Sequence, residues 1–305
     1  MSLRSRLGKE FTVTAELEPP RSAAPDSAFR QAAEAKPYVH AVNISDAPMA
    51  NLRMSPIALS HLIQSRFDLE TVFHFTCRDR NVLALQSELL GAAALGVKNV
   101  LTLTGDPPTR GDHPDAKGVF DVDVLGLIGL VKNLNQGKTR GRDLETPTSL
   151  SVAAAANPSA KDLEVEVSKF NAKLEAGAHF FQTQPIFSVQ DVLRFQDAFG
   201  GKPPAPVLYG VLPVRSAKMA KNVSKWCNVP GELVAGLETD GQVAGLRWAK
   251  QLVGDLRTLG VDGIHVYPLG RTELLGEFLE PVEHGFIEHG DALSTEAREV
   301  TSVGD

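Results

Sequence analysis

Strand-like and helix-like patterns alternate along almost the whole chain, and this alternation limits the possible folds more than any other feature. Eight short apolar runs have the character of β-strands, and each is followed by a longer run with helical periodicity. The strand-like runs cover residues 12–17, 38–45, 71–76, 98–104, 148–154, 178–183, 206–212 and 262–267. The helical runs lie near 26–36, 54–66, 82–95, 121–134, 160–176, 188–198, 215–225 and 242–259, with a last one at 271–283. Eight such units predict an α/β fold, a single (β/α)8 TIM barrel.

An open, doubly wound sheet is the alternative arrangement for alternating strands and helices. Such sheets usually carry a glycine-rich first turn, whereas this chain has EPPRS at residues 18–22. The length of 305 residues suits one barrel-sized domain or two small ones. We therefore expect the barrel to cover residues 1–285 and a polar C-terminal tail to cover 286–305.

Composition excludes several classes of protein. A formal charge of −6 argues against a dedicated nucleic-acid binder. No apolar run approaches the length that spans a membrane, and the opening residues MSLRSRLGKE lack the apolar core of a signal peptide, so we expect a cytoplasmic protein. The two cysteines, Cys77 and Cys227, form no CxxC pair, which argues against an iron–sulfur cluster or a structural zinc held by this chain alone. Barrels of this kind often form homo-oligomers, but no stripe of residues identifies an interface.

Polar side chains gather toward the ends of the predicted strands, where barrel enzymes assemble their active sites. In VFHFTC, His74 and Thr76 alternate with Phe73, Phe75 and Cys77, and we expect the apolar set to pack under helices. The same alternation is found in four other segments: Thr102, Thr104 and Asp106 against Leu101 and Leu103; Asn43 and Ser45; Gln182 and Gln184 with Phe180; and His265 and Tyr267 against Ile264 and Val266. Any one of these could be a satisfied polar group of the core, but their recurrence at strand ends favours a site.

Glu16 is the strongest single candidate for a catalytic residue. It lies between Ala15 and Leu17 and shares a strand face with Thr14 and Glu18, just before a Pro-Pro pair that ends the strand. A carboxylate there is costly to bury unless it is paired or protonated, and burial raises its pKa toward the range of a general acid. The alternative interpretation is a structural ion pair with a neighbouring Arg or Lys.

Three other patterns are weaker. Gly137-Lys138-Thr139 lacks the upstream glycine of a phosphate loop, because Lys132 stands in that place. His74 and Cys77 fall on opposite strand faces and so form no metal pair. The run from Arg78 to Arg80 could bind an anion, but a self-paired turn before the next helix is the first interpretation.

Seven segments taken together resemble the methylenetetrahydrofolate reductase family, flavin-dependent (β/α)8 barrels of one-carbon metabolism. The segments are AELEPPR, HFTCRDRN, LQSELLGAAALGVKNVLTLTGDPP, AAANP, KLEAGAHFFQTQPIF, GVLPVRSAKMA and HVYPLGR, and the likeness runs from residue 12 to about 283 in the same order. The resemblance implies that FAD accepts electrons from NADH or NADPH. It also implies that FAD then passes hydride to 5,10-methylenetetrahydrofolate, giving the 5-methyltetrahydrofolate used for methionine biosynthesis.

The resemblance also implies roles for individual residues. Glu16 matches the catalytic acid that protonates the departing nitrogen of the folate ring, and Asp106 matches the aspartate beside the flavin and the pterin. Gln184 matches the glutamine that contacts pterin and nicotinamide in turn. The positions expected to line the flavin are Ser45, His74, Thr104, Gly105, Asp106, Asn157, Glu166 and Lys173, the last for its phosphates. Those expected around folate and nicotinamide are Tyr267, Leu269 and Arg271, the last suited to a carboxylate of the glutamate tail.

The chain departs from the family pattern at four of these or neighbouring positions. Thr104 stands where many members have arginine, Asn157 where they have histidine, and Glu166 where aspartate is frequent. Ala217 replaces the phenylalanine that sandwiches folate or nicotinamide.

Two alternatives to a nicotinamide-dependent reductase stay open from the sequence. The first is a reductase subunit that receives electrons from a ferredoxin-type partner, since the chain has no cluster motif of its own. The second is a folate- or flavin-binding module that serves a methyltransferase without turnover. The presence of both Glu16 and Asp106 argues against the second.

Overall fold

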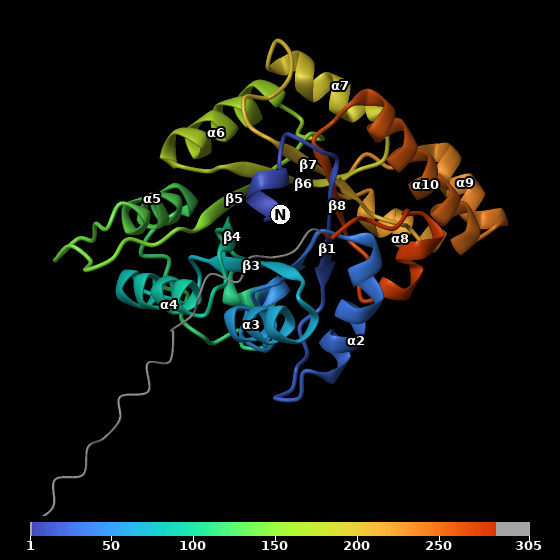
Figure 1. Cartoon of the computed structure of the whole chain (residues 1–305). Helices are drawn as coiled ribbons and strands as arrows, with labels where there is room; N and C mark the ends of the chain where they lie inside the picture. The colour runs from blue at the N-terminus through green and yellow to red at the C-terminus, as the bar shows by residue number, and fades with distance from the viewer. Residues whose placement is uncertain (1, 285–305) are drawn as a thin grey trace, which may run out of the picture.

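Eight parallel strands close into a barrel in chain order in the computed structural model, which describes residues 2–284 (Figure 1). Each strand pairs with the next along the chain, and β1 also pairs with β8, so the sheet has no free edge. The strands are β1 (Thr12–Leu17), β2 (Ala41–Ile44), β3 (Glu70–Thr76), β4 (Asn99–Leu103), β5 (Ser151–Ala156), β6 (Phe180–Ile186), β7 (Val207–Val211) and β8 (Gly263–Val266). This confirms the predicted TIM barrel and excludes the open sheet.

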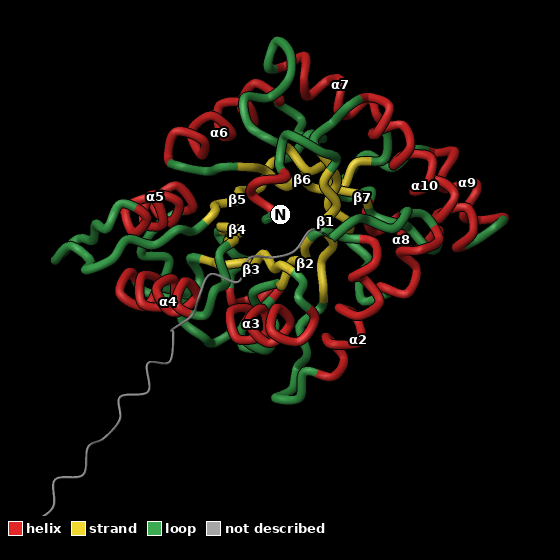
Figure 2. The backbone as a smooth tube through the Cα atoms, viewed as in Figure 1, coloured by secondary structure: helices red, strands yellow, loops and turns green. Residues whose placement is uncertain are grey.

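Helices form the outer ring, and the strands lie inside it (Figure 2). The α-helices are α1 (Leu3–Arg6), α2 (Asp26–Ala35), α3 (Pro56–Phe67), α4 (Val82–Ala94), α5 (Val124–Asn135), α6 (Leu163–Ala176), α7 (Val189–Ala198), α8 (Ala217–Val223), α9 (Gly231–Thr239) and α10 (Gln242–Leu259). Short 3-10 turns are η1 (Lys36–Tyr38), η2 (Pro48–Ala50), η3 (Pro108–Arg110) and η4 (Thr272–Glu277). Several α-helices begin where a side-chain oxygen accepts a backbone N–H: Asn81, Asp123, Asp162, Ser188 and Ser216.

The prediction and the structure differ at three elements. The strand expected from residue 38 begins at Ala41, because Lys36–Tyr38 continue α2 as a 3-10 turn. The helix expected over 271–283 is only the short turn η4. The sequence pattern does not predict α9, since its segment is bounded and interrupted by Pro230, Gly236 and Gly241, residues that weaken a helical pattern.

Side chains fill the barrel in layers. The bottom layer is apolar and is closed by Leu3 of α1, and the N-terminus lies at the centre of the ring in Figure 1. The members packed with Leu3 are Ala41, Val72, Leu101, Ala153, Phe180 and Leu208. Polar residues lie above them, toward the carboxyl ends of the strands. A filled interior of this kind makes the barrel a packed core with its site at one mouth.

The faces of β4 are the reverse of those expected. Leu101 packs in the apolar layer inside the barrel, and its register partner on β3 is the interior residue His74. Thr102 points to the other side, where its hydroxyl donates to the carbonyl of Ala153 at 3.0 Å. The expectation of Leu101 under helices and Thr102 facing a site was therefore wrong. Alternation separates two faces but does not identify the inner one when the interior itself is apolar.

The other strand faces agree with the prediction. Phe73, Phe75 and Cys77 belong to the core between barrel and helices, as do Ile264 and Val266. No helix within residues 2–284 is long and apolar enough to cross a membrane. The predicted tail over 286–305 lies outside the described residues.

Candidate active site

Glu16 lies at the carboxyl end of β1 on the inner face of the barrel, in register with Asn43 of β2. Its carboxylate is partly buried and accepts a hydrogen bond from the Ser45 hydroxyl at 3.2 Å. Loss of solvent raises its pKa from 4.5 to about 7; the Ser45 hydrogen bond opposes this shift and the nearby charge of Glu18 adds to it. Within residues 2–284 no Arg or Lys forms an ion pair with Glu16, so the alternative of a structural ion pair is not observed. Arg53 pairs instead with Glu18 at 3.3 Å.

A layer of hydrogen-bonded polar side chains lies below Glu16 inside the barrel. Asn43 and Gln182 bond each other through both amide groups, at 2.7 and 3.2 Å. The Asn43 amide also donates to Nε2 of His74 at 3.0 Å, and the Thr14 hydroxyl contacts Nδ1 of His265 at 2.9 Å. Burial lowers the pKa of His74 to about 4 and that of His265 to about 3, so both rings are neutral near pH 7. The layer is a connected support for the mouth above it.

Two cavities open at this end of the barrel and share two lining residues, Gln184 and Trp226. The larger cavity has a volume of about 410 Å³ and mostly apolar walls: Pro185, Leu212, Met219, Val223, Tyr267 and Leu269, with Ser216, Lys218 and Asn222 as the polar members beside the shared pair. The smaller has a volume of about 290 Å³ and is lined by Ala155, Ala156, Asn157, Glu166 and Lys173 beside the shared pair. Six of these lining residues are ones that the sequence predicts for a site: Asn157, Glu166, Lys173, Gln184, Tyr267 and Leu269.

The smaller cavity is polar and contains a cation, Lys173. This residue donates from Nζ to the carbonyl of Ala155 at 2.7 Å, and its two remaining N–H groups can donate to a ligand. Burial lowers the pKa of Lys173, while the charge of Glu166 opposes that shift. The carboxylate of Glu166 accepts the backbone N–H of Asn157 at 2.8 Å. A bound anion would offset the desolvation of the ammonium group, so this cavity suits a phosphate-bearing ligand.

Tyr267 forms part of the wall between the barrel interior and the larger cavity. Its hydroxyl donates to the Thr183 carbonyl at 2.8 Å, and its ring packs edge-on against His265 with centroids 4.6 Å apart. Burial raises the pKa of the phenol, and the charge of Glu16 raises it further. Tyr267 therefore stays neutral and fixed in position. Its ring lines the cavity, and its hydroxyl does not act as an acid.

The loop after β4 carries the other acidic candidate. Asp106 follows the last residue of β4 by three positions and pairs with Arg110 at 3.0 Å. Gly105 has φ +86°, and a Cβ there would lie 3.0 Å from Cβ of Thr76 and 3.1 Å from Cβ of Arg78, so the turn requires glycine. Thr104 is exposed. Thr104, Gly105 and Asp106 line neither cavity, and their expected contact with a cofactor stays a prediction.

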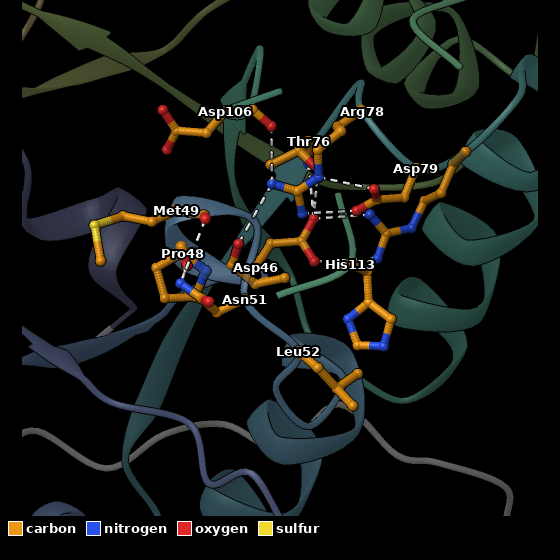
Figure 3. A network of polar contacts seen from close by, with 12 residues as sticks. Asp46, Pro48, Met49, Asn51, Leu52, Thr76, Arg78, Asp79, Asp106 and His113 are labelled. Atoms are coloured by element: carbon orange, nitrogen blue, oxygen red, sulfur yellow. Dashed lines mark hydrogen bonds and ion pairs between the residues drawn. The ribbon is translucent and has the colours of Figure 1, made fainter. Parts of the chain in front are cut away.

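A network of charged side chains, centred on the buried Arg78 and Asp46, holds this loop (Figure 3). Arg78 pairs side-on with Asp79, with two contacts of 2.7 Å, and donates to the backbone carbonyls of Ala47 and Asp106 at 3.3 and 3.4 Å. This self-paired arrangement agrees with the structural interpretation of the Arg78–Arg80 run. The carboxylate of Asp46 accepts the backbone N–H and the hydroxyl of Thr76 at 3.0 and 2.9 Å. These contacts of Asp46 and Arg78 connect the loops that follow β2, β3 and β4.

Arg271 is not among the residues that line the two cavities, and its guanidinium pairs with Glu273. The role expected for it toward a glutamate tail stays a prediction. Trp226 and Lys218, by contrast, line the cavities although no pattern in the sequence selects them. A tryptophan in a polar, helix-like segment carries no signal of which way its ring will face.

Comparison with known proteins adds to this geometry. Residues 2–283 match the family described as methylenetetrahydrofolate reductase. A 5,10-methylenetetrahydrofolate reductase of Salmonella typhimurium is 27% identical over 223 residues, covering 70% of each chain. One of Pectobacterium carotovorum is 28% identical and covers 70% of this chain and 69% of its own. A methylenetetrahydrofolate reductase (NADH) of Arabidopsis thaliana is 23% identical, over 70% of this chain and 38% of its own.

Two solved structures share the fold at low sequence identity. An EDTA monooxygenase from Chelativorans sp. BNC1 superposes with a TM-score of 0.52 at 10% identity, over 88% of this chain and 93% of its own. An oxaloacetate acetylhydrolase superposes with a TM-score of 0.51 at 11% identity, over 88% and 80%. At such identity the likeness extends to the barrel architecture alone.

Proposed function

The chain belongs to the methylenetetrahydrofolate reductase family, and we propose that it reduces 5,10-methylenetetrahydrofolate to 5-methyltetrahydrofolate at the mouth of its barrel, with Glu16 as general acid. The single observation that carries this proposal is the state of Glu16. Its carboxyl group lies at a strand end inside the barrel, free of a cationic partner among the described residues, with a pKa of about 7. A group with that pKa is substantially protonated near neutral pH and can give up its proton.

The folate chemistry requires such a group. The five-membered ring of the substrate opens when a proton reaches the departing nitrogen, which leaves an iminium that can accept hydride at its one-carbon unit. Glu16 would supply that proton. The Ser45 hydroxyl, 3.2 Å from the Glu16 carboxylate, would hold the group in place and stabilise the anion that remains after the transfer.

We propose that FAD binds at this mouth and supplies the hydride when bound. The polar cavity fits such a group: Lys173 has donors for phosphate oxygens, and Asn157 adds an amide on the same wall. Ser45 lies beside Glu16, and His74 belongs to the polar layer below it; both are neutral groups that suit the edge of a ring. Asp106, Thr104 and Gly105 would contribute from the loop after β4, and Gln184, shared by both cavities, would contact the folate.

We propose NADH or NADPH as the source of electrons. An absorbance spectrum of the purified protein tests the proposal directly. A yellow protein that bleaches with a nicotinamide nucleotide and regains its colour with methylenetetrahydrofolate supports it. A flavin-loaded protein that bleaches only with a low-potential donor would point to a ferredoxin-type partner, and folate binding without any turnover would point to a binding module.

Replacing Lys173 with methionine is expected to weaken flavin binding by at least about tenfold, because a charge-assisted hydrogen bond to phosphate is lost. The flavin dissociation constant, measured by fluorescence titration of protein stripped of flavin, checks this. Lys169→Met is the matched control, since Lys169 lies on the same helix α6 and is exposed. Equal affinities in the two variants would remove Lys173 from the cofactor site.

A further inference from the structure

Trp226 occupies an unusual place at the barrel mouth. Among the described residues it is one of two that line both cavities, and 53% of its surface is exposed. An indole is among the largest apolar groups that a protein can bury, and a wholly structural one is expected to be packed. The second tryptophan, Trp248, behaves in that way: it packs against the apolar cluster that includes Leu212 and Val223, and its Nε1 donates to the Phe187 carbonyl at 2.9 Å.

The backbone holds Trp226 firmly although its ring is open. Its N–H donates to the Val223 carbonyl at 3.1 Å, which extends the last turn of α8, and the next residue, Cys227, donates to the same carbonyl at 2.9 Å. The Cys227 side chain is buried in the cluster beneath the larger cavity. The exposed ring is therefore attached to an anchored turn, and an aromatic surface that is already positioned loses little entropy when a ligand covers it.

The two cavities that meet at this ring differ in chemistry. The larger has apolar walls from Met219, Val223 and Leu212, with the cation Lys218 among its lining residues. The smaller contains Lys173 and Glu166. A flat, weakly polar ring attached to a carboxylate suits the larger cavity, whereas a phosphate-bearing ligand suits the smaller.

We infer that Trp226 is the stacking surface for the p-aminobenzoyl ring of the folate in the larger cavity. This inference rests on the function proposed above. The benzoyl ring would lie between the indole and the apolar wall of α8, with the pterin toward Gln184 and the glutamate carboxylates toward Lys218. A planar ring on an indole gains dispersion and offset-stacking energy that an aliphatic side chain cannot supply.

The test compares three variants of the flavin-loaded enzyme. Trp226→Ala is expected to raise the dissociation constant of 5-methyltetrahydrofolate, measured by isothermal titration calorimetry, about tenfold. Trp226→Phe keeps an aromatic face and should stay within about threefold of the wild type. Lys225→Ala, an exposed neighbour that lines neither cavity, should bind as the wild type does. All samples are loaded with FAD to the same occupancy before calorimetry, because Trp226 also lines the smaller cavity.

Fluorescence gives a readout independent of turnover. The chain contains two tryptophans, so Trp248→Phe leaves Trp226 as the only indole. Its emission should be quenched as 5-methyltetrahydrofolate saturates the enzyme. The ligand concentration at half-maximal quenching should agree with the dissociation constant from calorimetry. Trp226→Ala binding folate as tightly as the wild type would overturn the inference and leave the proposed function intact. A wild-type protein that binds no folate would instead overturn the proposed function.

Discussion

Replacing Glu16 with glutamine is expected to lower the rate of folate reduction by at least about 100-fold, which is the lower range of what a positioned general acid contributes. Glutamine keeps the size of the side chain and can still accept the Ser45 hydrogen bond, but it has no proton to give to the departing nitrogen. The proposed transfer of electrons from a nicotinamide nucleotide to the flavin requires no such proton and should persist. Rapid-mixing measurement of the two half-reactions separates these effects.

Glu18→Gln is the matched control for this variant. Glu18 is the next acidic residue on the same segment, but it is exposed and pairs with Arg53 at 3.3 Å. Its replacement should change the rate of folate reduction little, because burial and not the Glu18 charge is the main cause of the raised Glu16 pKa. Undiminished folate turnover in Glu16→Gln would show that another group delivers the proton.

The pKa of Glu16 also sets a pH dependence with a definite sign. Wild-type folate reduction should fall as pH rises above about 7, because the carboxyl group loses the proton that we propose it donates. The stability of the folded protein is also expected to fall as pH rises. The folded protein holds this proton more tightly than the unfolded chain does, so Glu16 weakens the fold as pH rises from 4.5 to about 7. Thermal melts should find Glu16→Gln more stable than the wild type at pH 8 and equal to it at pH 4; the reverse order would refute the raised pKa.

Much of the fold could be predicted because each strand–helix unit repeats the same local pattern. Eight strand-like runs in order predicted a closed barrel. The absence of a glycine-rich first turn argued against the alternative, an open doubly wound sheet. The faces of β4 could not be predicted in the same way. Leu101 and Thr102 alternate as they would in any strand, and only the neighbours decide that Leu101 fills the interior while Thr102 finds a carbonyl of Ala153.

Residues of the candidate site could be predicted where the local sequence alone implies an energetic cost of burying a charged group. A carboxylate between Ala15 and Leu17 is costly to bury in any barrel, so the identity of its neighbours is enough to select Glu16. The local sequence around Trp226 gives no comparable signal. Its exposure depends on where α8 ends and on how Cys227 packs, which the sequence pattern does not reveal. The pairing of Asp106 with Arg110 likewise depends on the path of the loop after β4, which no periodic pattern describes.

Replacing Asp46 with alanine is expected to lower the free energy of unfolding by about 3 kcal/mol, because it leaves a largely buried guanidinium without its main partner. The Asp46 carboxylate faces Arg80 with two contacts, 2.7 and 3.2 Å, and 5% of its side chain is exposed. It also binds the backbone and hydroxyl of Thr76 at the end of β3. For a chain of this size the melting temperature should fall by roughly 5–10 °C, which calorimetry measures.

Two further variants separate burial from the mere loss of an ion pair. Asp240→Ala removes the exposed pair with Arg247, at 3.3 Å, and should change stability by less than about 1 kcal/mol. A double variant, Asp46→Leu with Arg80→Met, removes both buried charges and should recover part of the stability lost in Asp46→Ala. If the double variant is less stable than Asp46→Ala, the remaining contacts of Arg80, with Glu88 at 2.7 Å and over the ring of Phe75, stabilise the loop more than the Asp46 pair does.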